Sequence, residues 1–345
     1  MTPKPTRRRS LFRACSAFAL GGFVRNRSLA ADSPITAYVA LDREFSEPLI
    51  RDFELETGLK IRPKFDVEST KTIGLVNLIR SEASRPRADF FWNNEIINTI
   101  RLKKAGLLEP CRPRRADDFP ATFRDSDAFW FGFAARARVL IVDKRAFANQ
   151  PKPSSIGDLT DPKWKGRIGI AKPFFGTTAT HAACLYAAWG AERADRFFAD
   201  LKANQVRVLA GNKTVAEAVA AGNLAFGMTD TDDALVMQAQ GHPVEIVYPD
   251  TQAGGFGTLF LPNTLAIVKN GPNPEGARRL MDWVYRPETE TRLSEGPSGQ
   301  IPVSPKARKS PKVESPATVK AMQVDFEKSA DLFDDVMKRL AGLFA

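Results

Sequence analysis

Residues 131–143 read FGFAARARVLIVD, a long apolar run with two arginines in its middle. Such a run predicts a buried, extended strand. Arg136 and Arg138 alternate along it, so their side chains face the same side. On either side of the run, the chain alternates short apolar segments with amphipathic segments. The run therefore stands between two blocks of alternating strands and helices.

The block before the run predicts a parallel sheet. It contains three short apolar segments, each followed by a segment with helical spacing of its apolar residues, which is a β-α-β-α-β-α order. The predicted strands cover 35–40, 59–65 and 88–92, and the later helices cover 70–85 and 95–104.

The block after the run restarts the alternation beyond a proline-rich stretch at 151–162. Its predicted strands cover 167–170, 206–209, 224–229 and 244–248. A strand pair at 259–261 and 265–268 and a helix over 317–343 are predicted to follow. The fold class is therefore α/β, with a second α/β lobe beginning near residue 139.

The net charge of +10 comes mostly from the first 31 residues, which hold basic side chains and no acidic ones. A basic start, an apolar run over 14–24 and the small pair Ala30-Ala31 predict a cleaved export signal, and Arg8-Arg9 resembles a twin-arginine signal. We therefore expect a periplasmic protein. Mixed charge beyond this leader argues against a nucleic-acid partner. Two cysteines, Cys111 and Cys184, follow the leader, and their spacing leaves open whether they pair.

Six segments resemble one family and run in its order: ELETGLK at 54–60, KAGLLEP at 104–110, the strand at 131–143, DLTDPKWKGR at 158–167, AAGNLAFGMT at 220–229 and LPNTLAIVK at 261–269. The chain resembles periplasmic substrate-binding proteins of ABC importers, in the family 1 extracellular solute-binding class that includes ferric-ion and sugar-phosphate binders. DLTDPKWKGR is the most specific of these segments.

The resemblance implies a two-lobe periplasmic-binding-protein fold with crossover hinge strands and an interlobe ligand cleft. It divides the chain into an export signal (1–31), lobe 1 (32–138), lobe 2 (139–250) and a return to lobe 1 with C-terminal helices (251–345). It further implies a monomer without catalytic residues or a cofactor. Such a protein closes on a small ligand and delivers it to a permease in the inner membrane.

Candidate ligand-binding residues lie where each predicted strand ends, because ligands in open α/β sheets bind beyond the carboxyl ends of the strands. In lobe 1 these are Asp42, Glu68, Thr70, Asn93, Asn94 and Glu95; on the crossover run they are Arg136 and Arg138. In lobe 2 they are Gly176, Thr177, Thr178, Asn212, Lys213, Asp230 and Asp232.

The Gly176-Thr177-Thr178 loop precedes a predicted helix and could hold an anion with its backbone N–H groups and hydroxyls. The resemblance places bound phosphate or carbonate at this loop, beside a metal. Asn212 and Lys213 could complete the same site. The alternative for the threonines is a plain helix N-cap, and the alternative for the two arginines is a solvated or salt-bridged side chain.

Asp230, Asp232 and Asp233 stand where the ferric-binding relatives carry two adjacent tyrosines, so a usual tyrosinate-iron site is in doubt. Carboxylates would suit a hard cation, an amine or sugar hydroxyls. Their alternative role is to cap and begin the next helix. The ligand thus stays open between iron(III) or another hard cation with a companion anion and an organophosphate or phosphonate.

Two other functions remain as alternatives. Asp230-x-Asp232 after an apolar strand superficially resembles aspartyl-phosphate phosphatases, although Ala234 departs from that motif. A protein without a small ligand could instead interact through its basic segment 306–312 and its C-terminal helix.

Overall fold

The computed structural model describes residues 1–2, 33–66 and 72–344. Residues 3–31 of the predicted export signal, Glu68 and Thr70 lie outside the described residues. Within the described part, no helix is both long and apolar enough to cross a bilayer.

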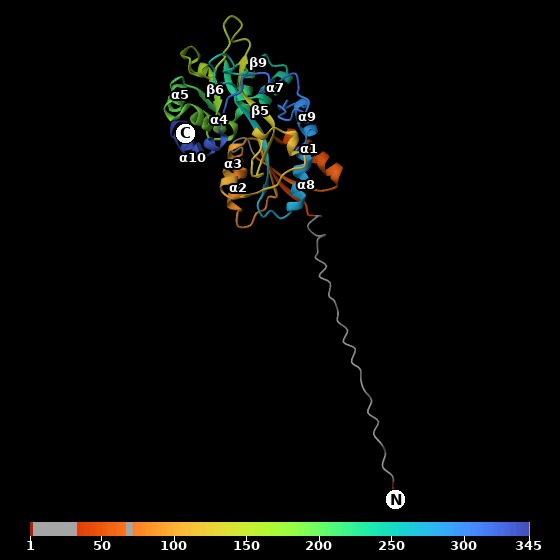
Figure 1. The fold of residues 1–345 in the computed structure, drawn as a ribbon. Coiled ribbons are helices and arrows are strands. Elements are labelled where there is room, and N and C mark those ends of the chain that lie inside the picture. The colour runs from red at the N-terminus through yellow and green to blue at the C-terminus, as the bar shows by residue number, and fades with distance from the viewer. Residues whose placement is uncertain (3–32, 67–71, 345) are drawn as a thin grey trace.

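One mixed sheet runs through the molecule, in the order β2-β1-β3-β10-β5-β8-β6-β7, with β4 beside β10 and β9 beside β5. Its helices lie in two lobes, α1, α2, α3 and α8 in one and α4 to α7 in the other, with β5 passing between them (Figure 1). The strands are β1 (Ile35–Val39), β2 (Ile61–Phe65), β3 (Phe90–Asn93), β4 (Leu108–Glu109), β5 (Phe131–Asp143), β6 (Ile168–Ala171), β7 (Arg207–Leu209), β8 (Phe226–Asp230), β9 (Val244–Val247) and β10 (Phe260–Val268).

The helices follow the predicted alternation. They are α1 (Arg43–Thr57), α2 (Ile73–Ser81), α3 (Ile97–Lys104), α4 (Gly176–Trp189), α5 (Ala191–Ala203), α6 (Asn212–Ala220), α7 (Thr231–Ala239), α8 (Pro274–Val284), α9 (Pro287–Glu295) and α10 (Phe326–Phe344). The mixed α/β class and the two-lobe arrangement agree with the sequence analysis.

The predicted parallel pairing of the first three strands is confirmed, and antiparallel strands link it to the second block. β1 pairs in parallel with β2 and β3, and β6 pairs in parallel with β7 and β8. Between these groups, β10 runs antiparallel to β3 and β5, and β5 runs antiparallel to β8. The chain returns from the second block as β10. This strand lies between β3 and β5 and pairs with the free edge of each.

β5 crosses from one lobe to the other, and all of its residues are buried. Its first half pairs with β10 and its second half, from Arg138, pairs with β8. The predicted strand pair at 259–261 and 265–268 is wrong, because β10 is one strand with a register shift between Leu261 and Asn263. Pro262 lies at this irregularity, which a sheet tolerates because proline has no N–H to donate.

Side chains hold the crossover where the ladder is irregular. Ala134 has a φ of 43° and donates its N–H to Glu290 Oε1 at 2.6 Å. The other Glu290 oxygen accepts the Ser304 N–H at 2.8 Å. Burial raises the pKa of Glu290 to about 7, despite these backbone hydrogen bonds. A side chain of α9 therefore replaces a strand partner at the point where β5 leaves the first lobe.

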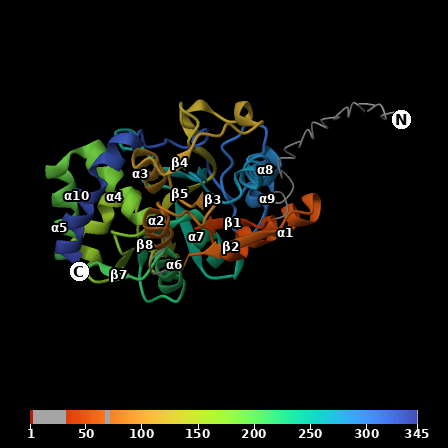
Figure 2. The ribbon, with the colours of Figure 1, turned by 90° about the horizontal axis from the view of Figure 1, so that it is seen from below.

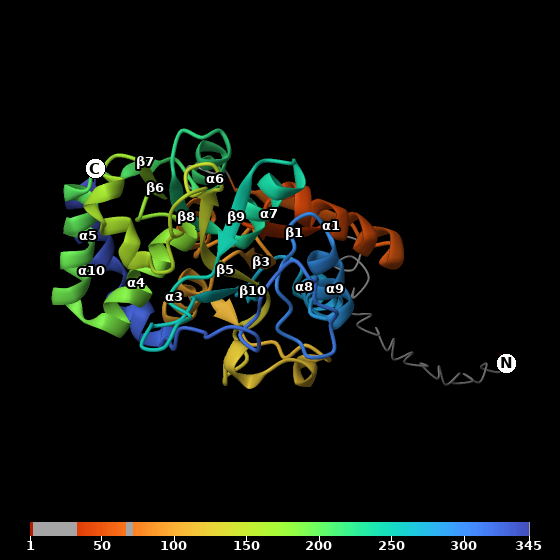
Figure 3. The ribbon, with the colours of Figure 1, turned by 90° about the horizontal axis from the view of Figure 1, so that it is seen from above.

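The C-terminal helix α10 begins at Phe326, whereas the prediction began it at residue 317. Ala321 pairs with Thr258 instead, and Met322 N–H donates to Thr258 O at 2.9 Å, so tertiary contacts hold this segment extended. α10 lies beside α4 and α3 (Figures 2 and 3) and contributes to the same apolar cluster as both. Asp331 of α10 also forms an ion pair with Lys104 of α3, with 2.6 Å between Oδ1 and Nζ.

Replacing Phe226 with alanine should test the core of the second lobe. The Phe226 side chain is fully buried against Trp164 and Phe147, so its loss leaves a cavity. We expect the free energy of unfolding in urea to fall by about 3–5 kcal/mol. Leu55→Ala is the control, since Leu55 is 85% exposed, and it should change the stability by less than about 0.5 kcal/mol. Equal losses in the two variants would contradict this packing.

Candidate functional site

Arg138 is the centre of a buried polar cluster where β5 meets β8. Its side chain is fully inaccessible to solvent. The guanidinium donates to Asp230 Oδ1 at 2.6 Å, to Asn212 Oδ1 at 3.1 Å and to the hydroxyl of Thr178 at 3.2 Å. These partners come from β8, α6 and α4, so one side chain joins the beginnings of two helices to the sheet.

Asp230 ends β8 and precedes α7, but its side chain does not cap that helix. Its Oδ2 accepts the Thr177 hydroxyl at 2.6 Å and the Asn212 side-chain amide at 3.0 Å. Burial alone would raise the pKa of Asp230, but Arg138 and Arg136 outweigh it and hold the pKa below its usual value. The carboxylate therefore stays ionised and fully bonded, which contradicts the alternative of a helix-capping Asp230.

Arg136 is the second buried arginine of β5. Its guanidinium lies 3.3 Å from Asp232 Oδ2 and 3.7 Å from Asp230 Oδ2, and it also donates to the carbonyl of Asn94 in the first lobe. Burial alone would lower the pKa of Arg136, but Asp232 and Asp230 raise it above its usual value. Both arginines are thus salt-bridged, as the alternative interpretation expected, and one of them also lines a cavity between the lobes.

That cavity has a volume of about 20 Å³, room for about one water molecule. Residues after β3 and β6, on β5 and β8, and at the starts of α4 and α6 form its wall. They are Asn94, Arg136, Ala171, Lys172, Phe175, Gly176, Thr177, Ala210, Gly211, Asn212 and Asp230. The cavity thus lies at the carboxyl ends of strands, where sequence reasoning placed a cleft.

The N-termini of α4 and α6 meet at this cavity. Neither helix has a side-chain cap, and the hydroxyls of Thr177 and Thr178 bond to Asp230 and Asn212 instead. The plain N-cap predicted as the alternative for these threonines is therefore wrong. Backbone N–H groups in the first turn of a helix have no partner inside that helix. Two sets of such donors and their positive dipole ends consequently face the cavity.

The remaining predicted residues do not line the cavity. Asn93 and Glu95 are fully buried in a network in which Glu95 accepts from the Asn93 amide and from the hydroxyl of Thr180, at 2.9 and 2.7 Å. Lys213 points to Glu44 of α1 at 3.7 Å. Asp42 acts on Arg136 electrostatically. These residues connect or flank the lobes.

Sequence reasoning missed Lys172. It directly follows β6 and lines the cavity, so the rule that placed the other residues at strand ends could have found it. The ion pairs among the described residues do not include Lys172. Its charge therefore adds to that of the helix N-termini.

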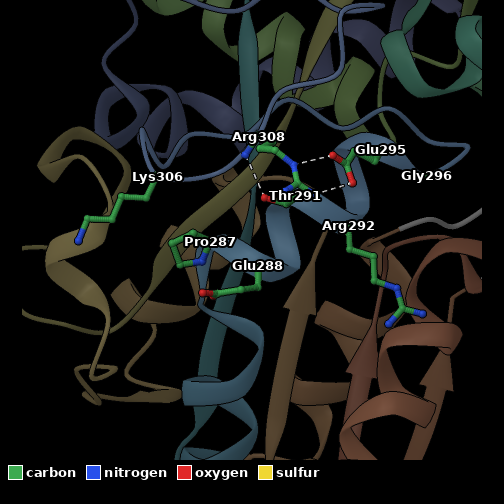
Figure 4. A pocket seen from close by; sticks show the side chains of 8 residues that line it. All are labelled: Pro287, Glu288, Thr291, Arg292, Glu295, Gly296, Lys306 and Arg308. Atoms are coloured by element: carbon green, nitrogen blue, oxygen red, sulfur yellow. Dashed lines mark hydrogen bonds and ion pairs between the residues drawn. The ribbon is translucent and has the colours of Figure 1, made fainter.

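A larger hollow, of about 620 Å³, lies on the outside of α9 (Figure 4). Its charged side chains already have partners: Arg308 pairs with Glu295, Arg292 with Asp52, and Lys306 with Asp118. It contains none of the predicted site residues. We therefore place the candidate site at the interlobe cavity.

The profile of the family described as bacterial extracellular solute-binding protein matches residues 98–330, well over half of the chain. This chain belongs to that family. Its function is that of a solute-binding receptor of an ABC importer. The family consists of binding proteins rather than enzymes.

Relatives in sequence include iron uptake protein A1 of Synechocystis, 26% identical over 77% of this chain and 76% of the relative. The major ferric iron-binding protein of Neisseria meningitidis serogroup A is 24% identical over 89% of this chain and 92% of the relative.

Similar solved structures include iron-bound HitA of Pseudomonas aeruginosa, with a TM-score of 0.80 and 21% identity, covering 89% of this chain and 99% of that chain. The periplasmic binding protein AfuA of Actinobacillus pleuropneumoniae, with fructose-6-phosphate bound, also has a TM-score of 0.80 and 21% identity, covering 90% of this chain and 98% of that chain. At these identities, the structures show a shared fold.

Acidification should destabilise the protein partly through His181, which is buried in α4. Burial first, and Arg138 second, lower the pKa of His181 from 6.5 to about 3. The unfolded chain therefore takes up this proton first, and folding stability falls as the pH drops from 6.5 toward 3. We expect His181→Gln to reduce this loss by up to about 1.4 kcal/mol per pH unit in urea unfolding.

His242→Gln is the matched control, because the His242 side chain is exposed. It should leave the pH dependence of unfolding unchanged. If His181→Gln and the wild-type protein lose stability in parallel between pH 6.5 and 5, the role assigned to His181 is wrong.

Proposed function

We propose that this protein binds a small anionic solute that carries a phosphate or phosphonate group. The observation that carries the proposal is the convergence of the α4 and α6 N-termini on one interlobe cavity. The anionic group would lie against the first turns of these helices and Lys172 after the two lobes move apart, because the cavity as it stands holds about one water molecule. Helix N-termini are common sites for phosphate groups.

The charge distribution supports an anion rather than a bare cation. Asp230 is the acidic residue on the cavity wall, and its charge is matched by Arg138 and Arg136. Lys172 adds a positive charge to that wall. The buried Nε of Arg136 has no hydrogen-bond partner among the described residues, so this arginine has a donor left for a solute.

The tyrosines argue against the usual ferric site. Tyr38 and Tyr186 donate to Glu82 and Asp195, Tyr248 accepts the Glu314 N–H, and Tyr285 is stacked on Phe119. None of the four lines the cavity described above. Burial is the main cause that raises the pKa of each phenol, to about 12 for Tyr38 and for Tyr248. Iron would have to displace the proton of such a phenol against the effect of its burial.

Iron(III) is the second candidate because two of the relatives in sequence are an iron uptake protein and a ferric iron-binding protein. In this chain it would need a companion anion to supply most of its ligands, because the nearby carboxylates are engaged by arginine. The same fold also holds fructose-6-phosphate in AfuA. Comparison alone therefore does not decide between the two ligands.

The wider role follows from the same proposal. The twin-arginine-like leader would be cleaved on export, and the folded protein would act in the periplasm as a monomer. It would deliver its solute unchanged to an inner-membrane permease, without nucleic-acid binding, phosphatase activity at Asp230 and Asp232, or a scaffold role for its basic segment. Native mass spectrometry of the protein as isolated would identify a retained solute by its mass.

Thermal unfolding with defined probes should test the ligand class. We expect fructose 6-phosphate or inorganic phosphate to raise the melting temperature, because a ligand that binds only the folded state stabilises it by mass action. Fructose alone should not. Ferric citrate should produce no visible tyrosinate absorption. Stabilisation by ferric salt with strong visible absorption, and none by either phosphate probe, would overturn the proposal.

Lys172→Ala should weaken binding of the phosphate probe that stabilises the wild-type protein. A hydrogen bond to a charged group contributes about 1.5–3 kcal/mol, which corresponds to about a 10- to 100-fold loss of affinity in calorimetric titration. Lys165→Ala is the matched control, since Lys165 is an exposed lysine of the same lobe. Unchanged affinity in Lys172→Ala would exclude Lys172 from the site.

A further inference from the structure

Three carboxylates lie close together beside the cavity. Asp230, Asp232 and Asp233 each offer an oxygen, and these oxygens lie within 4.8 Å of one another. Asp230 and Asp232 are buried, and Asp233 is half-buried. Oxygen ligands at such spacing are typical of hard cations such as Ca²⁺. By composition alone, this cluster would be a cation site.

A side chain of the protein already occupies this position. Arg136 is 3% exposed, and its Nη1 lies 3.3 Å from Asp232 and 3.7 Å from Asp230. Asp42 and Asp233 act on the same guanidinium electrostatically. Its second terminal nitrogen donates to the Asn94 carbonyl, which fixes the guanidinium between the lobes.

We propose that Arg136 is a specificity-determining residue, a fixed internal cation that occupies the aspartate cluster and excludes metal ions from it. An arginine cannot lose its proton at any physiological pH, so the exclusion is permanent. A metal ion could enter only by displacing a buried guanidinium from two carboxylates, which would leave that charge uncompensated.

Arg136 and Arg138 neutralise different parts of the aspartate cluster. Arg138 also neutralises Asp230, through the 2.6 Å contact, and would continue to do so without Arg136. Asp232 would then lose the guanidinium that lies 3.3 Å from its Oδ2, and Asp233 would lose the electrostatic effect of that charge. Carboxylates that lose a nearby positive charge gain affinity for a proton or for another cation. We therefore expect the aspartate cluster to bind a cation when Arg136 is replaced by an uncharged residue.

The consequence for solute choice rests on the proposed function: with the carboxylates matched by Arg136, the cavity presents its helix N-termini and Lys172 to an anion. The exclusion of metal ions does not depend on that function. The two ideas can consequently fail separately.

Arg136→Met tests the inference with Tb³⁺ and Ca²⁺ as probes. Methionine has a similar length and no charge. In calorimetric titration we expect the variant to bind Tb³⁺ at least about tenfold more tightly than the wild-type protein does. Tb³⁺ should also raise its melting temperature, which the loss of the arginine will have lowered. Ca²⁺ should act in the same direction with lower affinity.

Two control variants locate the effect, and a second measurement covers poor folding. Arg136→Lys keeps the charge and should gain no Tb³⁺ binding. The triple variant Arg136→Met, Asp232→Asn, Asp233→Asn should lose what Arg136→Met gained. If Arg136→Met folds poorly, refolding from urea with and without Tb³⁺ provides the second measurement, and Tb³⁺ should increase the folded yield.

Several results would overturn the inference. One is an Arg136→Met protein that gains no affinity for Tb³⁺, or that Tb³⁺ does not help to refold. Another is tight Tb³⁺ binding by the wild-type protein that Asp232→Asn abolishes. Failure of the phosphate probes to stabilise the wild-type protein would instead contradict only the proposed function.

Discussion

The ion pair between Arg138 and Asp230 is the contact on which the site depends. It is buried between β5 and β8, where hydrogen bonds from neighbouring side chains offset the cost of removing both charges from water. Thr177, Thr178 and Asn212 bond to the terminal nitrogens of Arg138 and to Asp230, whereas the Arg138 Nε has no hydrogen-bond partner among the described residues. Because these residues begin α4 and α6, the ion pair fixes where both helices start. The two helix N-termini thus meet at the cavity because of how the protein's own side chains bond to one charge pair.

The same charge balance explains how a shared fold can take different ligands. The relatives named for iron and the structure holding fructose-6-phosphate have the same architecture. In this chain, aspartates and arginines neutralise one another at the strand ends, and tyrosine is placed in other contacts. Fold and ligand chemistry are therefore set by different residues, and the local charges carry the information about the ligand.

Much of the fold could be predicted because it depends on local patterns. Period-two and helical spacings gave the strand and helix order, and the alternation of Arg136 and Arg138 placed both on one side of β5. The strand-end rule brought Asn94, Thr177, Asn212 and Asp230 to one cavity.

The predictions fail where contacts between segments that are distant in the sequence determine the structure. The extended segment before α10 exists because Ala321 pairs with Thr258, and the antiparallel β10 exists because an edge between β3 and β5 is open. Asn93 and Glu95 are polar residues at a strand end like Asn94, but they bond to one another inside the protein. No pattern in the sequence distinguishes these three. Only the packed neighbours determine which of them reaches the cavity.

The position of α10 also has a consequence for how the chain reaches its native state. Phe333, Val336 and Leu340 close an apolar cluster formed by α3 and α4, whose residues come much earlier in the chain. Until the chain has been synthesised through Leu340 and α10 has docked, that cluster lacks one wall and exposes apolar surface to water. Both lobes can therefore complete their packing only after α10 is in place, however early α3 and α4 have formed.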